Sequence, residues 1–338
     1  MMIKENQSLL TFNTFGIDVN ARHFSEVFSP GDLKEVFESH PSASHPHLVL
    51  GGGSNILFTS DFPGLVIKVS LKGIEVVEEN EREVLVKAAA GEDWDQFVSY
   101  CVLHGWGGLE NLSQIPGQVG SSPIQNIGAY GAELKDCFES LEAWGKSSGQ
   151  IRQFSAEACR FGYRDSIFKR EARGKYVILS VSFRLGKKSH KLKLGYGAIQ
   201  AEFQNRGISQ PTIADVREVI CSLRRSKLPD PHVTGNAGSF FKNPVVEQSV
   251  FELLKAEYPG LVAFPDKGGM KLAAGWLIEK AGWKGFREGD AGVHPRQALV
   301  LVNYGNANGL EIAALSEKIK DSVRKMFGVE LETEVNII

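Results

Sequence analysis

The stretch from Gly235 to Pro244 is the part of this sequence best suited to chemistry. It reads Gly-Asn-Ala-Gly-Ser-Phe-Phe-Lys-Asn-Pro, and so places a hydroxyl, an ammonium and two carboxamides among small and aromatic residues. Ser239 is a candidate proton donor or acceptor, because the preceding glycine lets the backbone approach a ligand closely. Lys242 and Asn243 are candidates to hold an anionic ligand. A Gly/Asn turn before a short apolar strand explains the same letters about equally well on spacing alone.

A second Gly-rich segment, Gly51-Gly52-Gly53-Ser54-Asn55, follows the apolar run Leu48–Leu50. Backbone amides exposed in such a turn can bind phosphate oxygens without a formal charge. The segment lacks the dinucleotide fingerprint, which needs a glycine where Ile56 stands, and it lacks the P-loop pattern. A pyrophosphate loop of another type and a plain tight turn both stay open.

The segment from Gly107 to Gly131 has little periodicity and almost no charge. A long uncharged loop inside a compact domain is often functional. Its backbone amides and four polar side chains could hydrogen-bond a large polar cofactor; these are Ser121, Ser122, Gln125 and Asn126. The lack of charge suits a neutral ring system better than a metal, so we predict no metal site.

Charged candidates occur in three further places. Arg164 follows a short helical stretch, and an arginine can hold a carboxylate through two parallel N–H bonds or form a surface ion pair. Arg224, Arg225 and Lys227 end a predicted helix, where cations complement the helix dipole; they could also meet a diphosphate. Glu334 would share one face of a final strand with Glu332, usually a solvated face.

Composition places the chain among soluble globular proteins. Its 338 residues suffice for two or three domains, and 42% apolar with 23% charged residues is ordinary. A net charge of −2 and the absence of a basic stripe argue against nucleic acid. The four cysteines are scattered without a C-x-x-C pair, which predicts core residues of a reduced cytoplasmic protein. No run approaches the ~18 apolar residues of a membrane span.

The elements that would carry these residues form three predicted regions. An α/β unit to about residue 70 has strands at 48–50 and 65–69 and a helix around 33–37. A second region has strands at 84–89 and 176–185 and helices at 92–104 and 212–223. A third begins after Pro231, with helices at 246–258, 270–281 and 310–326 and strands at 298–302 and 329–338.

Together these pieces resemble the UDP-N-acetylenolpyruvoylglucosamine reductase family of peptidoglycan synthesis, also called UDP-N-acetylmuramate dehydrogenases. The resemblance spans nearly the whole chain, and its specificity lies in the joint order of the motifs. They are Asn13–Gly16, Gly51–Asn55, Ile115–Gly131, Tyr163–Ser166, Lys227–Pro231, Gly235–Pro244 and Leu331–Val335.

The resemblance implies an α+β protein with a vanillyl-alcohol-oxidase-like FAD-binding fold. Two α/β subdomains, 1–70 and 71–228, would hold FAD non-covalently, and an α+β domain, 229–328, would hold the substrate; the strand 329–338 would pack near the site. NADPH would be the hydride source, and UDP-N-acetylglucosamine enolpyruvate the substrate. We expect a cytoplasmic monomer that binds neither nucleic acid nor membrane. Another FAD-dependent oxidoreductase of this fold and a non-catalytic UDP-sugar-binding regulator are the alternatives.

Site residues carry over from the family position by position. Arg164, Ser239 and Glu334 match catalytic positions, with Ser239 as the proton donor to carbon. The residues implied to contact FAD are Gly51, Gly52, Gly53, Ser54, Asn55, Gly117, Gly120, Ser121, Ser122, Gln125, Asn126 and Gly128. The residues implied to contact substrate are Tyr196, Lys227, Asn243 and Gln297, and Tyr196 resembles the subtype in which a tyrosine closes over the substrate. Asn336 departs from the family pattern, which often has arginine there.

Overall fold

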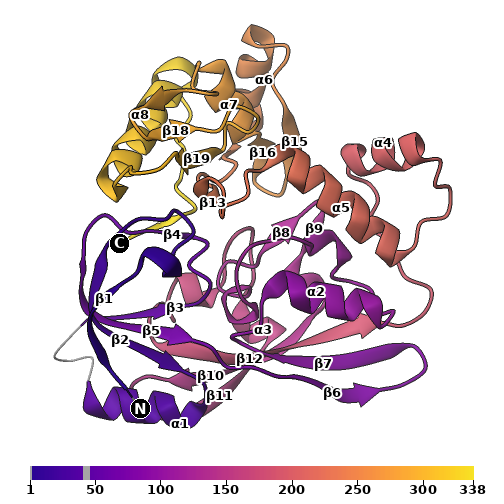
Figure 1. Ribbon diagram of the computed structural model, residues 1–338. Helices are drawn as coiled ribbons and strands as arrows, with labels where there is room; N and C mark the ends of the chain where they lie inside the picture. The colour runs from indigo at the N-terminus through magenta and orange to yellow at the C-terminus, as the bar shows by residue number, and fades with distance from the viewer. Residues whose placement is uncertain (1, 41–45) are drawn as a thin grey trace. The chain divides into compact units, whose positions relative to one another are not determined.

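The computed structural model describes residues 2–40 and 46–338, and the chain divides into two compact units (Figure 1). The first unit comprises Met1–Gln7, Ala21–Gly52 and Pro63–Ser226. The second comprises Ser8–Asn20, Gly53–Phe62 and Lys227–Ile338. Its long C-terminal part starts within two residues of the predicted start of the substrate-binding domain, and the split of the first unit into two FAD-binding subdomains stays a prediction.

A four-stranded sheet of order β1-β2-β5-β3 forms the beginning of the first unit. Its strands are β1 (Lys4–Ser8), β2 (Asn20–Val27), β5 (Phe62–Val69) and β3 (His47–Leu50). The parallel pairing of β3 with β5 confirms the two strands predicted here, and it ends with Leu50 opposite Lys68, just before the Gly-rich segment. Helix α1 (Pro30–Ser39) begins at a capping box between Ser29 and Asp32.

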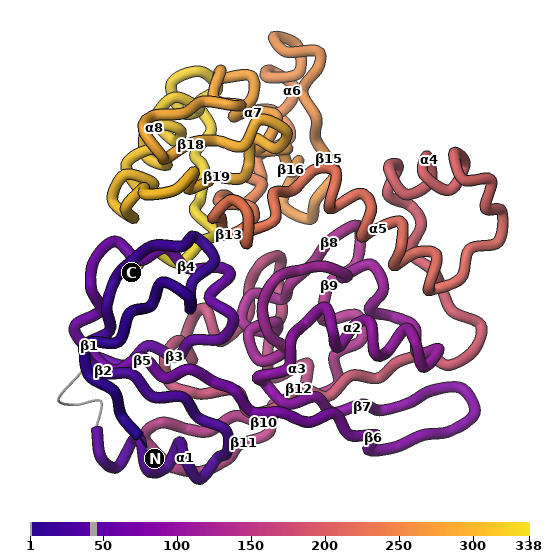
Figure 2. Tube along the Cα trace, viewed as in Figure 1, coloured from indigo at the N-terminus to yellow at the C-terminus, as the bar shows by residue number. Residues whose placement is uncertain are grey.

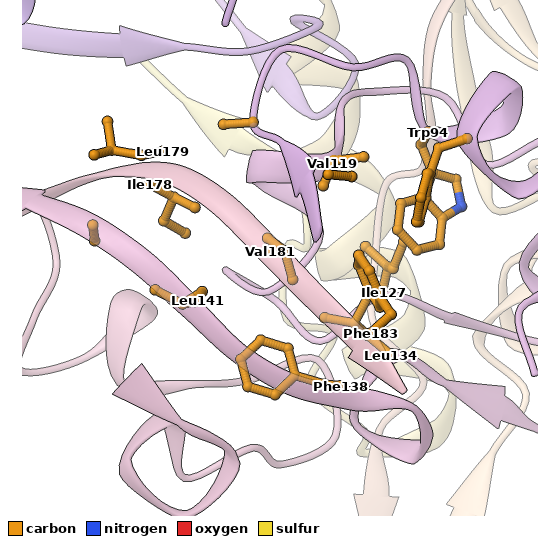
Figure 3. Close-up of a cluster of buried hydrophobic side chains, with 14 of the residues drawn as sticks. Trp94, Val119, Ile127, Leu134, Phe138, Leu141, Ile178, Leu179, Val181 and Phe183 are labelled. Carbon is orange, nitrogen blue, oxygen red and sulfur yellow. The ribbon is translucent and has the colours of Figure 1, made fainter. Parts of the chain in front are cut away.

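A five-stranded antiparallel sheet of order β11-β10-β12-β7-β6 forms the rest of the first unit. Its strands are β6 (Ile74–Glu79), β7 (Glu83–Ala89), β10 (Phe138–Gly145), β11 (Ile151–Ser155) and β12 (Tyr176–Gly186). Helix α2 (Trp94–Leu103) packs on it, with the rings of Trp94 and Phe97 5.9 and 5.1 Å from that of Phe183. Figure 3 shows this core, in which Val119 and Ile127 come from the long uncharged loop.

The long loops of the first unit contain several short strands and helical turns. They are β8 (Gly128–Ala129), β9 (Ala132–Glu133), α3 (Ala156–Cys159) and the 3₁₀ turns Glu110–Leu112, Val119–Ser121, Leu134–Asp136 and Ile167–Lys169. Helices α4 (Gly197–Arg206) and α5 (Ile213–Lys227) close the unit. They share a small apolar core formed by Ile199, Phe203, Val216, Val219 and Ile220. The helix predicted at 212–223 is therefore confirmed as α5, which buries an apolar face in this core.

The second unit contains a sheet of order β13-β19-β18-β17 and a smaller one of order β14-β16-β15. Their strands are β13 (Gly235–Ser239), β14 (Val245–Val246), β15 (Ala263–Asp266), β16 (Gly269–Leu272), β17 (Arg287–Glu288), β18 (Ala291–Val293) and β19 (Val300–Asn303). Its helices are α6 (Gln248–Glu257), α7 (Ala274–Lys280), α8 (Gly309–Phe327) and a 3₁₀ turn, Leu10–Phe12. A two-stranded parallel pair, β4 (Ile56–Leu57) with β20 (Asn336–Ile337), holds the C-terminal end beside the segment after the Gly-rich loop (Figure 2).

Two predicted elements of the second unit are wrong in extent. The helix predicted at 270–281 begins only at Ala274, because Gly269–Leu272 pairs with β14 and β15 as the middle strand of a sheet. The strand predicted at 329–338 is regular only at Asn336–Ile337, with an isolated bridge between Thr333 and Phe241. In both places tertiary pairing, rather than local periodicity, sets the structure.

The four cysteines are buried, as predicted from their scatter. Burial raises the pKa of the Cys159 thiol to about 12, and it raises the pKa of Cys101 and Cys137 further. Thiols with such pKa values stay protonated and behave as small apolar groups. Within residues 2–40 and 46–338, no helix has the length and apolar character needed to cross a bilayer.

An ion pair between Asp95 of α2 and Arg217 of α5 fastens two helices of the first unit to the long loop. Arg217 Nη1 and Nη2 donate to the carboxylate, at 2.6 and 3.0 Å, and the Gln114 N–H donates to it at 2.5 Å. Burial alone would raise the pKa of Asp95, but the hydrogen bonds from Arg217 and from the Gln114 N–H outweigh it, so the pKa lies below 3.8.

We expect Asp95→Asn to lower the free energy of unfolding at neutral pH by about 1–2 kcal/mol. A carboxyl group with a lowered folded-state pKa contributes stability above its unfolded pKa of about 3.9, and this is lost as the pH falls through the folded value. The difference in the free energy of unfolding between wild type and variant, measured by urea unfolding, should therefore become smaller below about pH 4. A difference that stays constant into acid would contradict the assignment. Glu218→Gln, which removes an exposed partner of Arg206, is the control.

Candidate active site

Part of the Gly-rich segment lies against the long loop within the first unit. A Cβ added to Gly52 would stand 3.0 Å from the Cα of Gly117, and one on Gly51 would stand 3.3 Å from Gln118 Oε1. Only residues without side chains allow the two loops to approach so closely. The predicted cofactor residues Gly51, Gly52 and Gly117 are therefore brought together.

The side-chain oxygen of Gln118, Oε1, is a buried hydrogen-bond acceptor without a donor among the described residues. The Gln118 Nε2 donates to the Gly91 carbonyl at 3.1 Å, whereas no described residue donates to its Oε1. A buried unsatisfied acceptor costs about 1–3 kcal/mol, so such atoms in native proteins often face a ligand. An N–H or O–H group of a bound cofactor would satisfy it. The sequence interpretation missed Gln118; a polar residue between two functional glycines was the available signal.

The remaining polar residues of the loop differ in what they can offer a cofactor. Ser121 Oγ donates to the Gln118 carbonyl at 2.7 Å and stays half-buried. Ser122 is 1% exposed, and its hydroxyl and N–H both donate to the Val119 carbonyl, so it mainly closes the 3₁₀ turn. Gly120 packs on Ala90, whose Cβ would lie 2.5 Å from an added Cβ. Gln125 is half-buried in the same loop.

Arg164 lies against the end of the same loop. Its Nη2 donates to the Gly128 carbonyl at 2.5 Å, and a Cβ on Gly128 would stand 2.8 Å from its Nη1. Asn126 is fully buried and donates to the Gly162 carbonyl at 2.9 Å, which fixes the turn that carries Arg164. Arg164 itself has φ +51°, a left-handed conformation that is uncommon for residues other than glycine. Such strain is typical of functional sites.

Two aromatic residues and a second arginine lie near one another in the first unit. The rings of Tyr130 and Tyr196 meet edge to face at 5.2 Å, and Tyr196 is 44% exposed at the start of α4. Burial lowers the pKa of the Arg224 guanidinium, an effect that Tyr130 and Asp95 oppose. Arg224 Nε donates to the Gln114 carbonyl at 3.1 Å, its one hydrogen bond to the described chain. Tyr130 is thus a candidate that the sequence interpretation left out, whereas Arg224 was considered there both as a helix-end cation and as a contact for a diphosphate.

The other part of the Gly-rich segment belongs to the second unit and is tied to Thr14. The Gly53 carbonyl accepts the Thr14 N–H at 3.1 Å, and a Cβ on Gly53 would stand 2.0 Å from the Phe12 carbonyl oxygen. Thr14 also binds Asn236, because its Oγ1 donates to the Asn236 carbonyl at 2.7 Å. The Asn13–Gly16 motif therefore joins the Gly-rich segment to the strand that carries Ser239. Ser54, next in the segment, is half-buried.

Ser239 and Glu334 are brought together in the second unit. The Glu334 N–H donates to the carbonyl of Phe240, the residue after Ser239, at 2.8 Å. The Asn55 side chain reaches the Glu334 carbonyl at 3.4 Å, and Asn336 donates twice to the Asn55 carbonyl, from its N–H and its Nδ2. Ser239 is exposed, and its hydroxyl makes no hydrogen bond to the described chain. The third catalytic candidate, Arg164, belongs to the first unit.

Two predicted substrate residues converge on the start of α7. Asn243 Oδ1 accepts the Ala274 N–H at 3.0 Å, and a Cβ on Gly275 would stand 3.1 Å from Gln297 Oε1. Gln297 Oε1 also accepts the Leu299 N–H at 3.3 Å. Both amide oxygens are therefore committed to the protein, which leaves both NH₂ groups as donors for a ligand.

The two lysines considered as substrate contacts differ in their environment. Lys242 forms an ion pair with Glu332, so its charge is already compensated. Lys227 ends α5, is half-buried and has no side-chain hydrogen bond within the described chain. The environment therefore favours Lys227 over Lys242 as a ligand for an anion.

Comparison with known proteins places the chain in a family. Residues 230–338 match the sequence profile of the UDP-N-acetylenolpyruvoylglucosamine reductase C-terminal domain, and residues 22–155 match that of an FAD binding domain. The UDP-N-acetylenolpyruvoylglucosamine reductase of Pseudomonas fluorescens Pf0-1 is 51% identical, with 99% of each chain covered. The Pseudomonas aeruginosa reductase is also 51% identical, with 99% of this chain and 98% of the relative covered.

A solved structure agrees with these sequence relatives. The crystal structure of UDP-N-acetylenolpyruvylglucosamine reductase from Thermus caldophilus superposes with a TM-score of 0.69 at 23% identity, covering 99% of this chain and 98% of that chain. It confirms the fold, and the matched FAD binding domain confirms the cofactor class that the sequence motifs predict. This chain belongs to the UDP-N-acetylenolpyruvoylglucosamine reductase family.

Proposed function

We propose that this oxidoreductase reduces the enolpyruvyl group of UDP-N-acetylglucosamine enolpyruvate to a lactyl ether, with Ser239 as the proton donor to carbon. The observation that carries the assignment of roles is the pairing of Glu334 with the residue after Ser239, beside a serine hydroxyl free to meet a ligand. Full-length relatives bear the name of this reaction's enzyme. The product, UDP-N-acetylmuramate, serves peptidoglycan synthesis.

The residues of the long loop fit a flavin. The close approach of Gly51 and Gly52 to Gly117 and Gln118 holds the two loops together, and the Gln118 Oε1 beside this contact has no donor among the described residues. Neutral backbone and amide groups suit a ring system rather than a metal. When bound there non-covalently, FAD supplies hydride chemistry, with NADPH as the source of electrons.

Arg164 would stabilise the negative charge that develops on the substrate carboxylate as hydride adds to the neighbouring alkene carbon. Its guanidinium is held in place by the Gly128 carbonyl and by the strained turn, so no reorganisation is needed during the reaction. Preorganised charge of this kind is usually the largest single contribution to catalysis.

Ser239 would deliver the proton to the resulting carbanionic carbon. A serine hydroxyl is a weak acid, far from the ideal catalytic pKa at neutral pH, but a carbanion or enolate is a strong enough base to accept its proton. An ionised Glu334 would repel the developing charge. We therefore assign Glu334 a protonated, hydrogen-bonding role toward the same carbon or carboxylate.

The decisive assay follows NADPH oxidation with and without the enolpyruvyl substrate. The purified protein should be yellow, and substrate-dependent NADPH oxidation should greatly exceed the rate in air alone. Rapid oxidation in air without substrate would instead indicate an oxidase of the same fold. Binding of the UDP-sugar with no NADPH oxidation would indicate a non-catalytic regulator.

Arg224 is proposed to bind an anionic group of the substrate, because its half-buried guanidinium has one described partner, a neutral carbonyl. Arg224→Leu should raise the KM for substrate by about 10–100-fold, the equivalent of a lost charged hydrogen bond, and change kcat less. Titration calorimetry with the UDP-sugar would show the same loss. Arg225→Leu, which removes the exposed neighbouring arginine, is the matched control. An equal effect in both variants would indicate a general electrostatic contribution instead.

We infer a cytoplasmic location from NADPH and the nucleotide-sugar substrate, and the buried unpaired thiols suit a reducing compartment. That the chain acts as a monomer, without nucleic acid or membrane as a partner, stays a prediction.

A further inference from the structure

An irregularity in strand β13 decides which way Ser239 faces. Asn236 lies opposite Val302 of β19, and Ser239 lies opposite Val300, so β13 takes three steps where its partner takes two. The extra residue is a β-bulge, which shifts the alternation of side chains and re-aims those that follow. Without it, Ser239 would share a face with Ala237, since residues i and i+2 of a strand point the same way. Ala237 is 6% exposed, whereas Ser239 is exposed.

The buried side chain of Asn236 closes this bulge. Its Oδ1 accepts the Gly238 N–H at 3.0 Å, and its Nδ2 donates to the Thr234 carbonyl at 2.8 Å. Gly238, which directly precedes Ser239, has φ +69°, a left-handed conformation that favours glycine. The side-chain amide of Asn236 therefore links Thr234 to Gly238 and stabilises the left-handed conformation of Gly238.

The backbone of Asn236 is held independently by Thr14. The Asn236 N–H donates to the Thr14 carbonyl at 2.9 Å, and the Asn236 carbonyl accepts the Thr14 hydroxyl at 2.7 Å. Regular pairing resumes after the bulge, because the Phe240 N–H donates to the Leu299 carbonyl and the Phe240 carbonyl accepts the Glu334 N–H. The bulge thus sets both the direction of Ser239 and the point at which Glu334 attaches.

We propose that Asn236 is a positioning residue, whose buried amide holds the bulge that turns the Ser239 hydroxyl out of the buried face of β13. Its amide is committed to the Gly238 N–H and the Thr234 carbonyl, so its role is to act through Ser239. The inference rests on the proposed function, because it gives Ser239 the role of proton donor. It adds a residue whose contribution to catalysis is purely conformational.

The test measures the two half-reactions of Asn236→Ala by stopped flow. Flavin reduction by NADPH should stay near the wild-type rate, and reoxidation by the enolpyruvyl substrate should slow by at least about tenfold, a fraction of what proton donation supplies. In a Ser239→Ala background the same change should slow reoxidation no further, because effects that act through one group are not additive. Multiplicative slowing in the double variant would overturn the proposal.

A matched control separates positioning from stability. Asn303 of β19 is also buried, and its Oδ1 also accepts an N–H two residues on, from Gly305, at 2.9 Å. Asn303→Ala should lower the melting temperature to a similar extent and slow both half-reactions equally or not at all. A selective loss of reoxidation in Asn303→Ala would assign the effect to general disturbance of the sheet.

Gly238→Ala provides a second route if Asn236→Ala does not fold. A Cβ on Gly238 would meet nothing within 4 Å, so this variant strains the bulge only through the left-handed backbone angle. It should show the same selective slowing of reoxidation, and where Asn236→Ala does not fold, wild-type reoxidation in Gly238→Ala would overturn the proposal. If Ser239→Ala alone leaves reoxidation unchanged, the proposed function of Ser239 fails. If Ser239→Ala slows it and both Asn236→Ala and Gly238→Ala do not, the positioning role alone fails.

Discussion

Ser239→Ala should slow reoxidation of the reduced flavin by the enolpyruvyl substrate about 10²–10⁴-fold, the range for a positioned proton donor. Flavin reduction by NADPH should stay near the wild-type rate, because this half-reaction needs no proton at the substrate carbon. The hydroxyl stands exposed at the end of β13 without a partner in the described chain, so its removal leaves no buried group unsatisfied. Stopped-flow spectroscopy of flavin absorbance separates the two steps.

The controls for this variant are chemical. Ser239→Cys keeps a proton donor on the same Cβ and should recover part of the lost rate, with a changed pH profile of reoxidation. Equal slowing of both half-reactions in Ser239→Ala would contradict the role, since it would point to a disturbed flavin site. A stability loss well above about 0.5 kcal/mol would also be unexpected for an exposed side chain.

The second large effect concerns the cofactor. Gly52→Val should weaken FAD binding about 10–100-fold, the equivalent of the 1–3 kcal/mol that overpacking typically costs. The reason is geometric, because a Cβ on Gly52 would stand 3.0 Å from the Cα of Gly117, and backbone on both sides cannot give way cheaply. The variant should purify with little flavin absorbance, and Gly52→Ala should be intermediate.

Its matched control is Gly31→Val, in the first turn of α1. A Cβ there meets only the Ser29 hydroxyl, at 3.5 Å, which is ordinary contact. Gly31→Val should keep full flavin content. Retention of FAD by Gly52→Val at wild-type affinity, measured by titration of the apoprotein, would show that the contact between the two loops is not part of the cofactor site.

The sequence identifies Ser239 as a candidate but cannot reveal its orientation. The motif Gly235–Pro244 that contains Ser239 is continuous in sequence, so it can be recognised without the structure. The bulge that turns it outward depends on register against Val300 and Val302, some 60 residues later in the chain. The position of Gln118 between two glycines is visible in the sequence, but its unsatisfied oxygen is not, because Gly51 and Gly91, which contact its side chain, come from other segments.

Secondary structure follows the same division between local and distant causes. The helices α2, α5 and α8 have long apolar stripes, and their positions could be predicted to within a few residues. The segment Met270–Leu272 continues the helical pattern of α7 but forms a strand, because β14 and β15 offer it partners on both sides. Glu334 was found from its motif, although the segment around it is mostly irregular.

The interleaving of the second unit bears on how this protein can be dissected. Residues 230–338 match a single domain profile. Two of their strands nevertheless depend on earlier parts of the chain, because β20 pairs with Ile56–Leu57 and Asn236 of β13 accepts a hydrogen bond from Thr14. A fragment that begins at that profile boundary would leave β20 without its partner strand, and it would lose the two hydrogen bonds between Thr14 and the backbone of Asn236. A chimaera between two relatives would therefore have to transfer Ser8–Asn20 and Gly53–Phe62 together with the C-terminal part. The boundary of the sequence profile and the boundary of the folded unit thus lie at different places in this chain.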